Sequence, residues 1–330
     1  MAEALLRLLG LTLLGYIIFK PRVIYRRVLP PFTFIMINIM FPLYSITRYG
    51  MNWEDAVSAG PFWLILFFML GVSTLALQYG GVRLLLKWNV FPGLREENRS
   101  EFILLFAVHN AGYIPLPILQ VLAPPAVTVY MFSYILAFQL IFWSFVISII
   151  TSDSGEGIKI RIKPNMPLAG LLTGLLLAST GLYGHIPEIL RNGGEFISAY
   201  AMDGILIVLG GILAGIPHDK LRAHREFVPF VIWRQIIWPG GALVLMVLFR
   251  LAVQGGGLFP GTPITLSDSW RWLQLVVVLE AAAPPGTNLG IVIKAFGSRE
   301  QLNYAGSGLI ASYAAAALFL PLYVWLALTI

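Results

Sequence analysis

Two short polar stretches interrupt apolar parts of the sequence. The first is HNAGYIPLP at 109–117, and the second is EAAAPPGTN at 280–288. A proline inside a helix removes a backbone hydrogen bond and clashes with the carbonyl one turn back, at a cost of about 3 kcal/mol. Where a helix breaks, one new end has free N–H groups that attract anions, and the other has free carbonyls that suit a small cation. If the two segments cross at their breaks, they predict a binding site for ions.

Ionisable residues accompany both stretches. Glu280 stands just before the second break, and a carboxyl group among apolar residues marks a functional site by default. It is a candidate cation ligand or proton carrier, with a structural role beside Arg234 or a backbone group as the alternative. For His109, a protonation switch and a packed neutral imidazole both remain open. The alternative for the prolines is a purely structural role, in which they only kink helices for packing.

Three further polar residues lie within apolar segments. Asp203 is a candidate functional residue on the scaffold side or an interfacial one, and Ser133 is a plausible polar lining residue. Arg234 is expected to extend its guanidinium toward the membrane surface, with attraction of an anion as the alternative.

The composition indicates a polytopic membrane protein. Hydrophobic residues make up 58% and charged residues 12% of the 330 residues, and the mean hydropathy is +0.81. A soluble domain carries roughly twice that charge. Residues 126–150 contain no charge, and about 20 such residues span a bilayer. The net charge of +6 reflects basic loops, so we expect the lipid bilayer as a partner and no nucleic acid.

The sequence gives no sign of an enzyme or of a metal cofactor. It contains no cysteine, no HExxH, no Walker loop and no GxSxG, and its four histidines are scattered. We therefore expect no enzymatic activity, no resident metal and no direct use of ATP by this chain.

Ten hydrophobic segments predict ten transmembrane helices, because only helices and closed barrels satisfy the backbone in lipid. The first is interpreted as a short span rather than a removed signal peptide, since a basic loop without a small-residue cleavage site follows it. The segments lie near 4–19, 32–47, 61–84, 100–122, 126–151, 166–183, 198–216, 229–252, 272–296 and 304–329.

Basic residues alternate between the loops. One set of loops carries 16 of the 22 Lys and Arg residues, and the bias of cytoplasmic loops toward Lys and Arg places this set inside. Both termini are then outside. The 16 residues are Lys20, Arg22, Arg26, Arg27, Arg83, Lys87, Arg95, Arg99, Lys159, Arg161, Lys163, Lys220, Arg222, Arg225, Lys294 and Arg299.

The ten segments form two groups of five. A polar stretch at 151–165 separates them, and an odd number of spans in each half forces the halves into opposite orientations. This arithmetic predicts an inverted repeat, with the first half at 1–152, a cytoplasmic linker at 153–165 and the second half at 166–330. Interruptions in corresponding spans of such halves indicate the binding site of a transporter.

Three stretches resemble the bacterial branch of the auxin efflux carrier family, which is related to the bile-acid sodium symporters. NAGYIPLP (110–117) is similar to the family's fourth-span pattern, and AAAPPGTNLGIVIKAFG (281–297) to its ninth-span pattern. KPNMPLAGLLTGLLLAS (163–179) resembles the entry to span six, although Met166 intervenes between Asn and Pro. Two departures affect the fourth span: His109 stands where plant members tend to have proline, and the pair Pro115 and Pro117 shifts the point at which the helix breaks.

The resemblance implies a multi-pass secondary transporter of the cell membrane for small organic anions such as carboxylates or auxin-like acids. Spans 1, 2, 6 and 7 would form a scaffold, through which a homodimer would form. Spans 3–5 and 8–10 would form a transport unit with elevator-type alternating access. The substrate would bind where helices 4 and 9 cross, at Asn110, Ala111, Gly112, Tyr113, Pro115, Pro117, Pro284, Pro285, Gly286, Thr287 and Asn288.

The coupling ion stays open at this stage. In the bile-acid branch an acidic residue at a similar place resembles part of a sodium site, so Glu280, Asn110 and Ser133 could hold sodium. Proton coupling through Glu280 and His109, and uncoupled transport, are the other possibilities. Two rival functions are a sodium-coupled symporter of larger amphipathic acids and a membrane ligand sensor that does not transport.

Overall fold

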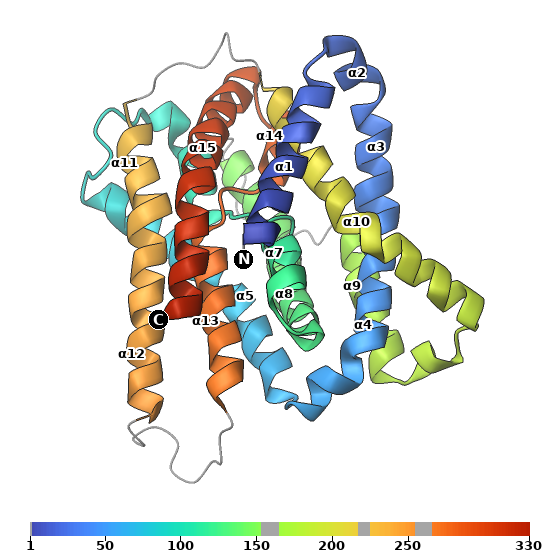
Figure 1. Ribbon diagram of the computed structural model, residues 1–330. Coiled ribbons are helices and arrows are strands. Elements are labelled where there is room, and N and C mark those ends of the chain that lie inside the picture. Colours follow the sequence, from blue (N-terminus) through green and yellow to red (C-terminus); the bar gives the residue numbers. More distant parts are fainter. Residues whose placement is uncertain (1, 153–164, 217–224, 255–265) are drawn as a thin grey trace.

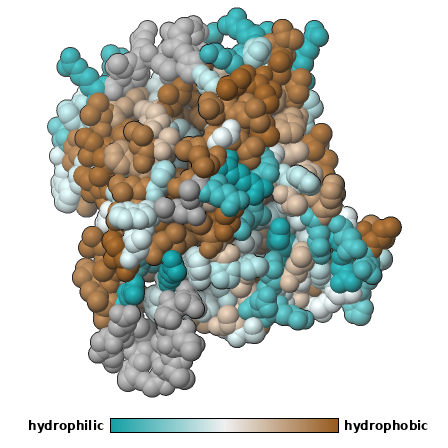
Figure 2. Space-filling view, in the orientation of Figure 1, coloured by the Kyte–Doolittle hydropathy of each residue, from teal (hydrophilic) through white to brown (hydrophobic). Residues whose placement is uncertain are grey.

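The computed structural model describes residues 2–152, 165–216, 225–254 and 266–330, and over these ranges the protein is all-helical with no sheet (Figure 1). Most of the predicted linker at 153–165 lies outside the described residues. Six of the described helical runs are long and apolar enough to cross a membrane. Brown apolar side chains cover broad areas of the surface between hydrophilic regions at its upper and lower right ends (Figure 2), as expected of a multi-pass membrane protein.

The first half of the chain is built from helices that follow the predicted segments. α3 (Leu29–Ile35), a π-helical turn η1 (Met36–Met40) and α4 (Phe41–Ser58) form one continuous run. The fourth predicted segment is divided between two short helices, α6 and α7. The remaining bounds are α1 (Ala2–Phe19), α2 (Arg22–Arg27), α5 (Phe62–Lys87), α6 (Arg99–Ala107), α7 (Pro115–Leu122) and α8 (Pro125–Ser152).

The second half is built from a similar series of helices. α11 (Phe227–Ile232), a second π-helical turn η5 (Trp233–Ile237) and α12 (Trp238–Gln254) are continuous. The ninth predicted segment is divided into α13 (Leu266–Ala282) and α14 (Asn288–Phe296). The others are α9 (Met166–Ser179), α10 (Glu188–Ala214) and α15 (Arg299–Thr329).

The second predicted segment, drawn at 32–47, is too short. The helical run continues to Ser58, and polar side chains along it bond back to the helix itself. The Ser45 hydroxyl donates to the Phe41 carbonyl and the Asn52 amide to the Arg48 carbonyl. Such local bonds satisfy the polar groups without ending the helix, so polarity alone misplaced the boundary.

Two groups of helices pack closely. α1 lies along α10, and α4 lies along both α9 and α10; α5 lies along α8, and α13 contacts α12 and α15. Glycines bring α1 and α10 together, since a Cβ added at Gly15 would lie 2.1 Å from the Ile207 carbonyl oxygen. A Cβ at Gly210 would lie 1.9 Å from the Thr12 oxygen. Small residues of this kind let helix backbones approach in a membrane.

Candidate functional site

The two helix breaks meet and pair through their backbones. His109 and Pro285 form an isolated antiparallel bridge. The Asn110 N–H donates to the Pro284 carbonyl at 2.8 Å, and the Gly286 N–H donates to the Val108 carbonyl at 3.0 Å. A Cβ at Gly286 would lie 3.2 Å from the His109 oxygen, so glycine suits this close approach. Each break therefore satisfies one N–H and one carbonyl group of the other.

The prolines of the two breaks have different roles. Pro115 is the first residue of α7, where a helix needs no N–H, so it begins the second half-helix rather than breaking the first. Pro284 and Pro285 lie within the break between α13 and α14. As prolines they cannot donate to the carbonyls of residues 280 and 281, and α13 ends at Ala282.

Asn110 is held at the centre of the crossing. Its Oδ1 accepts the Tyr113 N–H at 3.0 Å, and its Nδ2 donates to the Tyr313 hydroxyl on α15 at 3.0 Å. The Tyr113 hydroxyl interacts with the side chain of Asn288, the first residue of α14. Asn110 thus fixes the loop before α7, and Tyr113 links that loop to the start of α14.

A small cavity of about 30 Å³ lies between residues 109–113, which lead into α7, and residues 286–288 at the start of α14. The start of a helix carries a partial positive charge that attracts anions, and the start of α14 lines this cavity together with the segment before α7. The volume holds a water molecule or two rather than an organic acid. The lining residues are Phe41, His109, Asn110, Ala111, Gly112, Tyr113, Ile135, Phe138, Gln139, Phe142, Gly286, Thr287 and Asn288.

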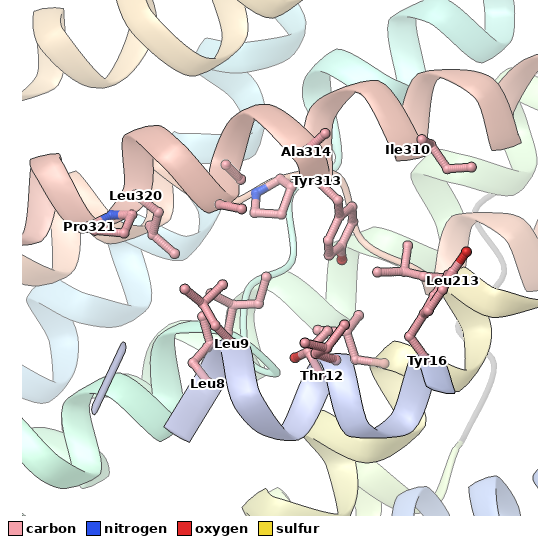
Figure 3. A pocket seen from close by; sticks show the side chains of 16 residues that line it. Leu8, Leu9, Thr12, Tyr16, Leu213, Ile310, Tyr313, Ala314, Leu320 and Pro321 are labelled. Carbon is pink, nitrogen blue, oxygen red and sulfur yellow. The ribbon is translucent and has the colours of Figure 1, made fainter. Parts of the chain in front are cut away.

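A larger cavity of about 300 Å³ lies beside the crossing, between α1, α10 and α15. Figure 3 shows Leu9 and Thr12 of α1 facing Tyr313 of α15 across it. Ile114 and Pro284 bring both breaks to its wall. Its lining is almost entirely apolar and consists of Leu8, Leu9, Thr12, Leu13, Tyr16, Ile114, Leu209, Leu213, Pro284, Ile310, Tyr313, Ala314, Ala316, Ala317, Leu320 and Pro321.

His109 and Glu280 form a buried pair. The His109 Nε2 lies 3.0 Å from the Glu280 Oε2 and 2.8 Å from the Tyr134 hydroxyl, and its Nδ1 lies 3.1 Å from the Gln78 Oε1. The exposed fraction of both His109 and Glu280 is 1%. An imidazole and a carboxyl at this distance share protons readily, so the pair is chemically suited to carry one.

Arg234 does not extend toward the membrane surface, so that expectation is wrong. It lies on the π-helical turn η5 with an exposed fraction of 0%. Its guanidinium donates to the carbonyls of Ala281 and Ala283, at 2.5 and 2.6 Å. The π-helical turn, which inserts an extra residue into the helix, is a common feature of functional sites.

The structure does not bring Ser133 or Asp203 to the lining of the crossing cavity. The Ser133 hydroxyl lies 3.5 Å from the Val129 carbonyl and interacts with Tyr49. Asp203 on α10 accepts two bonds from Arg7 on α1, at 2.7 and 2.8 Å. This pair links two helices that already pack closely.

Three polar residues at the crossing were not singled out from the sequence as site residues. Gln78 is a lone amide within an apolar segment, and such a residue is a detectable signal. Tyr134 and Tyr313 resemble the many other tyrosines of the spans, and nothing in their local sequence distinguishes them.

Among the described residues, no group of three or more histidine, aspartate or glutamate side chains is placed to hold a metal ion. Comparison of the chain with protein-family models and with curated proteins gives no match.

Proposed function

We propose that this protein is a secondary transporter of small organic anions and that the substrate's carboxylate binds where the two breaks cross. One observation carries the proposal: the segment that leads into α7 and the start of α14 line a common cavity, and the backbones of the two breaks are paired beside it. The helix dipole at both starts favours a negative charge. Asn110 and Asn288 add neutral amides that suit a carboxylate.

An inverted repeat of ten spans is supported by the matching breaks. The fourth span of the first half would be α6 with α7, and that of the second half α13 with α14. Each half also contributes a tyrosine of its fifth span to the crossing, Tyr134 from α8 and Tyr313 from α15. With the basic loops inside, both termini of the chain face outward.

Elevator-type movement fits the packing of the helices. α1, α4, α9 and α10 would form the fixed scaffold, and the two crossing spans with α5, α8, α12 and α15 the moving unit. The apolar cavity lies where these two units face each other. Polar contacts also join the two units, since the Gln120 amide donates to the Tyr44 hydroxyl and the Tyr130 hydroxyl donates to the Ala56 carbonyl. Movement of one unit past the other would have to break these bonds. The scaffold would also form the interface of a homodimer.

Coupling to an ion is assigned to the His109–Glu280 pair. The two side chains share a buried contact at 3.0 Å, and His109 also belongs to the backbone bridge. Loading the pair with a proton changes the net charge at the crossing, which is the quantity that an anionic substrate senses. Ligand binding and ion loading would thus be linked electrostatically.

Reconstituted protein tests the proposal. Thermal-shift screening of small carboxylates and indole acids should find ligands, and proteoliposomes loaded with a hit should show counterflow of its labelled form. Binding without counterflow would support the ligand sensor instead. If none of the tested acids binds and none shows counterflow, the proposed anion site is contradicted.

A second candidate is a carrier of larger amphipathic acids, favoured by the 300 Å³ apolar cavity whose wall includes Pro284 and Ile114. A carboxylate at the crossing could leave an apolar body in this cavity. The two candidates are separated by comparing acids that share a carboxylate but differ in apolar length. Tighter binding of the longer acids supports the second candidate, and exclusion of them supports the first.

A further inference from the structure

Arg234 occupies the end of α13 that a bound cation would otherwise occupy. A helix leaves its last carbonyls without partners. At α13, the carbonyls of residues 280 and 281 would need N–H groups from residues 284 and 285, which are prolines. The Arg234 guanidinium supplies a donor to Ala281 and a second to Ala283.

Arg234 also balances a buried carboxyl group. It interacts electrostatically with Glu280, which stands in the last turn of α13 and has an exposed fraction of 1%. A carboxylate in this setting needs a positive partner, because an unpaired buried charge is unstable. Carbonyls at the end of a broken helix together with a carboxylate are the ligands that carriers offer to sodium.

Arg234 is not placed to touch the substrate. It lines neither the 30 Å³ cavity nor the 300 Å³ cavity. Its guanidinium points to backbone carbonyls, and its Nε lacks a hydrogen-bond partner among the described residues. Its influence therefore passes through α13 and Glu280.

We infer that the Arg234 guanidinium is the resident cation of the crossing, tethered where a coupling sodium ion would bind. The carbonyl end of α13 then takes no sodium in the wild-type protein. The inference rests on the proposed function only in that a cation site is expected at the break of a carrier. The positive charge at this point then belongs to an arginine of the chain and not to a sodium ion from solution.

Removal of the guanidinium should open a cation site. Thermal unfolding of purified protein in detergent would be followed in low-millimolar sodium, potassium, choline or guanidinium chloride at equal ionic strength. The wild type should give the same midpoint in all four salts. The Arg234→Ala variant should unfold at a lower temperature than the wild type. Its unfolding midpoint should be a few degrees higher in guanidinium or sodium chloride than in choline chloride.

Two further variants separate this role from general packing. Arg234→Lys keeps a positive charge and should retain most of the stability, with no response to sodium. Arg250→Ala removes an arginine of the neighbouring helix α12 that donates to the Ile330 carbonyl, and should show no response to guanidinium.

Sodium-specific stabilisation of the wild type would overturn the inference, and this arm applies even if Arg234→Ala cannot be purified. The inference would also be overturned if neither guanidinium nor sodium raised the unfolding midpoint of Arg234→Ala. Neither measurement uses a substrate. Failure here therefore leaves the counterflow test of transport intact, and failure of counterflow leaves this test intact.

Discussion

Asn110 is the residue on which most of the crossing converges. Its backbone pairs with Pro284 of the other half, its side-chain oxygen holds the Tyr113 N–H, and its amide reaches Tyr313. A single side chain thus fixes the start of α7 and connects it to α15. Its amide offers a donor and an acceptor on two separate atoms of a short side chain.

Replacement of Asn110 by alanine should weaken substrate binding about 10- to 100-fold, because it leaves a buried N–H and a hydroxyl without partners at about 1–3 kcal/mol each. Titration of purified protein with a ligand from the carboxylate screen measures this. Asn165→Ala is the matched control, since Asn165 also accepts an N–H three residues on, at Leu168, but at the start of α9. Normal affinity in Asn110→Ala would remove the crossing as the substrate site.

Replacement of Glu280 by glutamine should alter ion dependence more than substrate affinity. The amide fills the same space beside His109 but cannot exchange a proton or carry a charge. We expect the pH dependence of counterflow to flatten while the ligand's Kd changes less than about threefold, since Glu280 does not line the cavity. Asp203→Asn serves as control. An unchanged pH and sodium profile would make Glu280 structural.

At the scale of elements, the two breaks are not equivalent. The first is a loop of several residues that precedes a proline-started helix. The second is a short gap in which two prolines withhold N–H groups from the end of α13. The consequences of removing prolines should therefore differ between them.

The double variant Pro284→Ala/Pro285→Ala should impair transport at normal expression, because it restores N–H donors and lets α13 extend toward α14. Pro115→Ala/Pro117→Ala, which changes as many prolines in the first turn of α7, should retain more of the transport rate. Counterflow normalised to protein content compares the two. Equal activity of both double variants would mean that all four prolines are ordinary kinks.

The sequence predicted much of this framework, because hydrophobic length and Pro–Gly interruptions are local properties. It located both breaks and named His109, Asn110 and Glu280 beside them. It did not predict the direction of Arg234, since a π-helical turn depends on how neighbouring helices pack. The partners Tyr134 and Tyr313 and the two cavities also depend on contacts between distant segments. The sequence does not distinguish an apolar side chain that faces lipid from one, such as Leu9, that lines a cavity.

At the scale of the whole molecule, the close packing of α1 on α10 contrasts with the apolar cavity between them and α15. The tight contact is made by glycines that leave no room for a side chain. The cavity, in contrast, is lined by side chains that do not interlock. The molecule thus combines a closely packed helix pair with a loosely filled boundary.

Gly15→Ala should lower the thermal midpoint in detergent, because the new Cβ would overlap the Ile207 carbonyl; overpacking of this kind costs about 1–3 kcal/mol. Gly10→Ala on the same helix meets nothing within 4 Å and should be neutral or slightly stabilising. If both variants unfold alike, the approach of α1 to α10 is not as close as described.

The backbone bridge between the two breaks has a consequence for biosynthesis. The carbonyl of Val108 and the N–H of Asn110 are paired with residues 286 and 284 of the second half. Unpaired backbone groups are not tolerated in lipid, so the first half cannot reach its final form while it is alone in the membrane. At translation rates of roughly 5–20 residues per second, it must wait on the order of ten seconds for the second half to emerge. An insertase or chaperone that shelters a half-made span would act in that interval, and each half expressed separately should be degraded unless its counterpart is supplied.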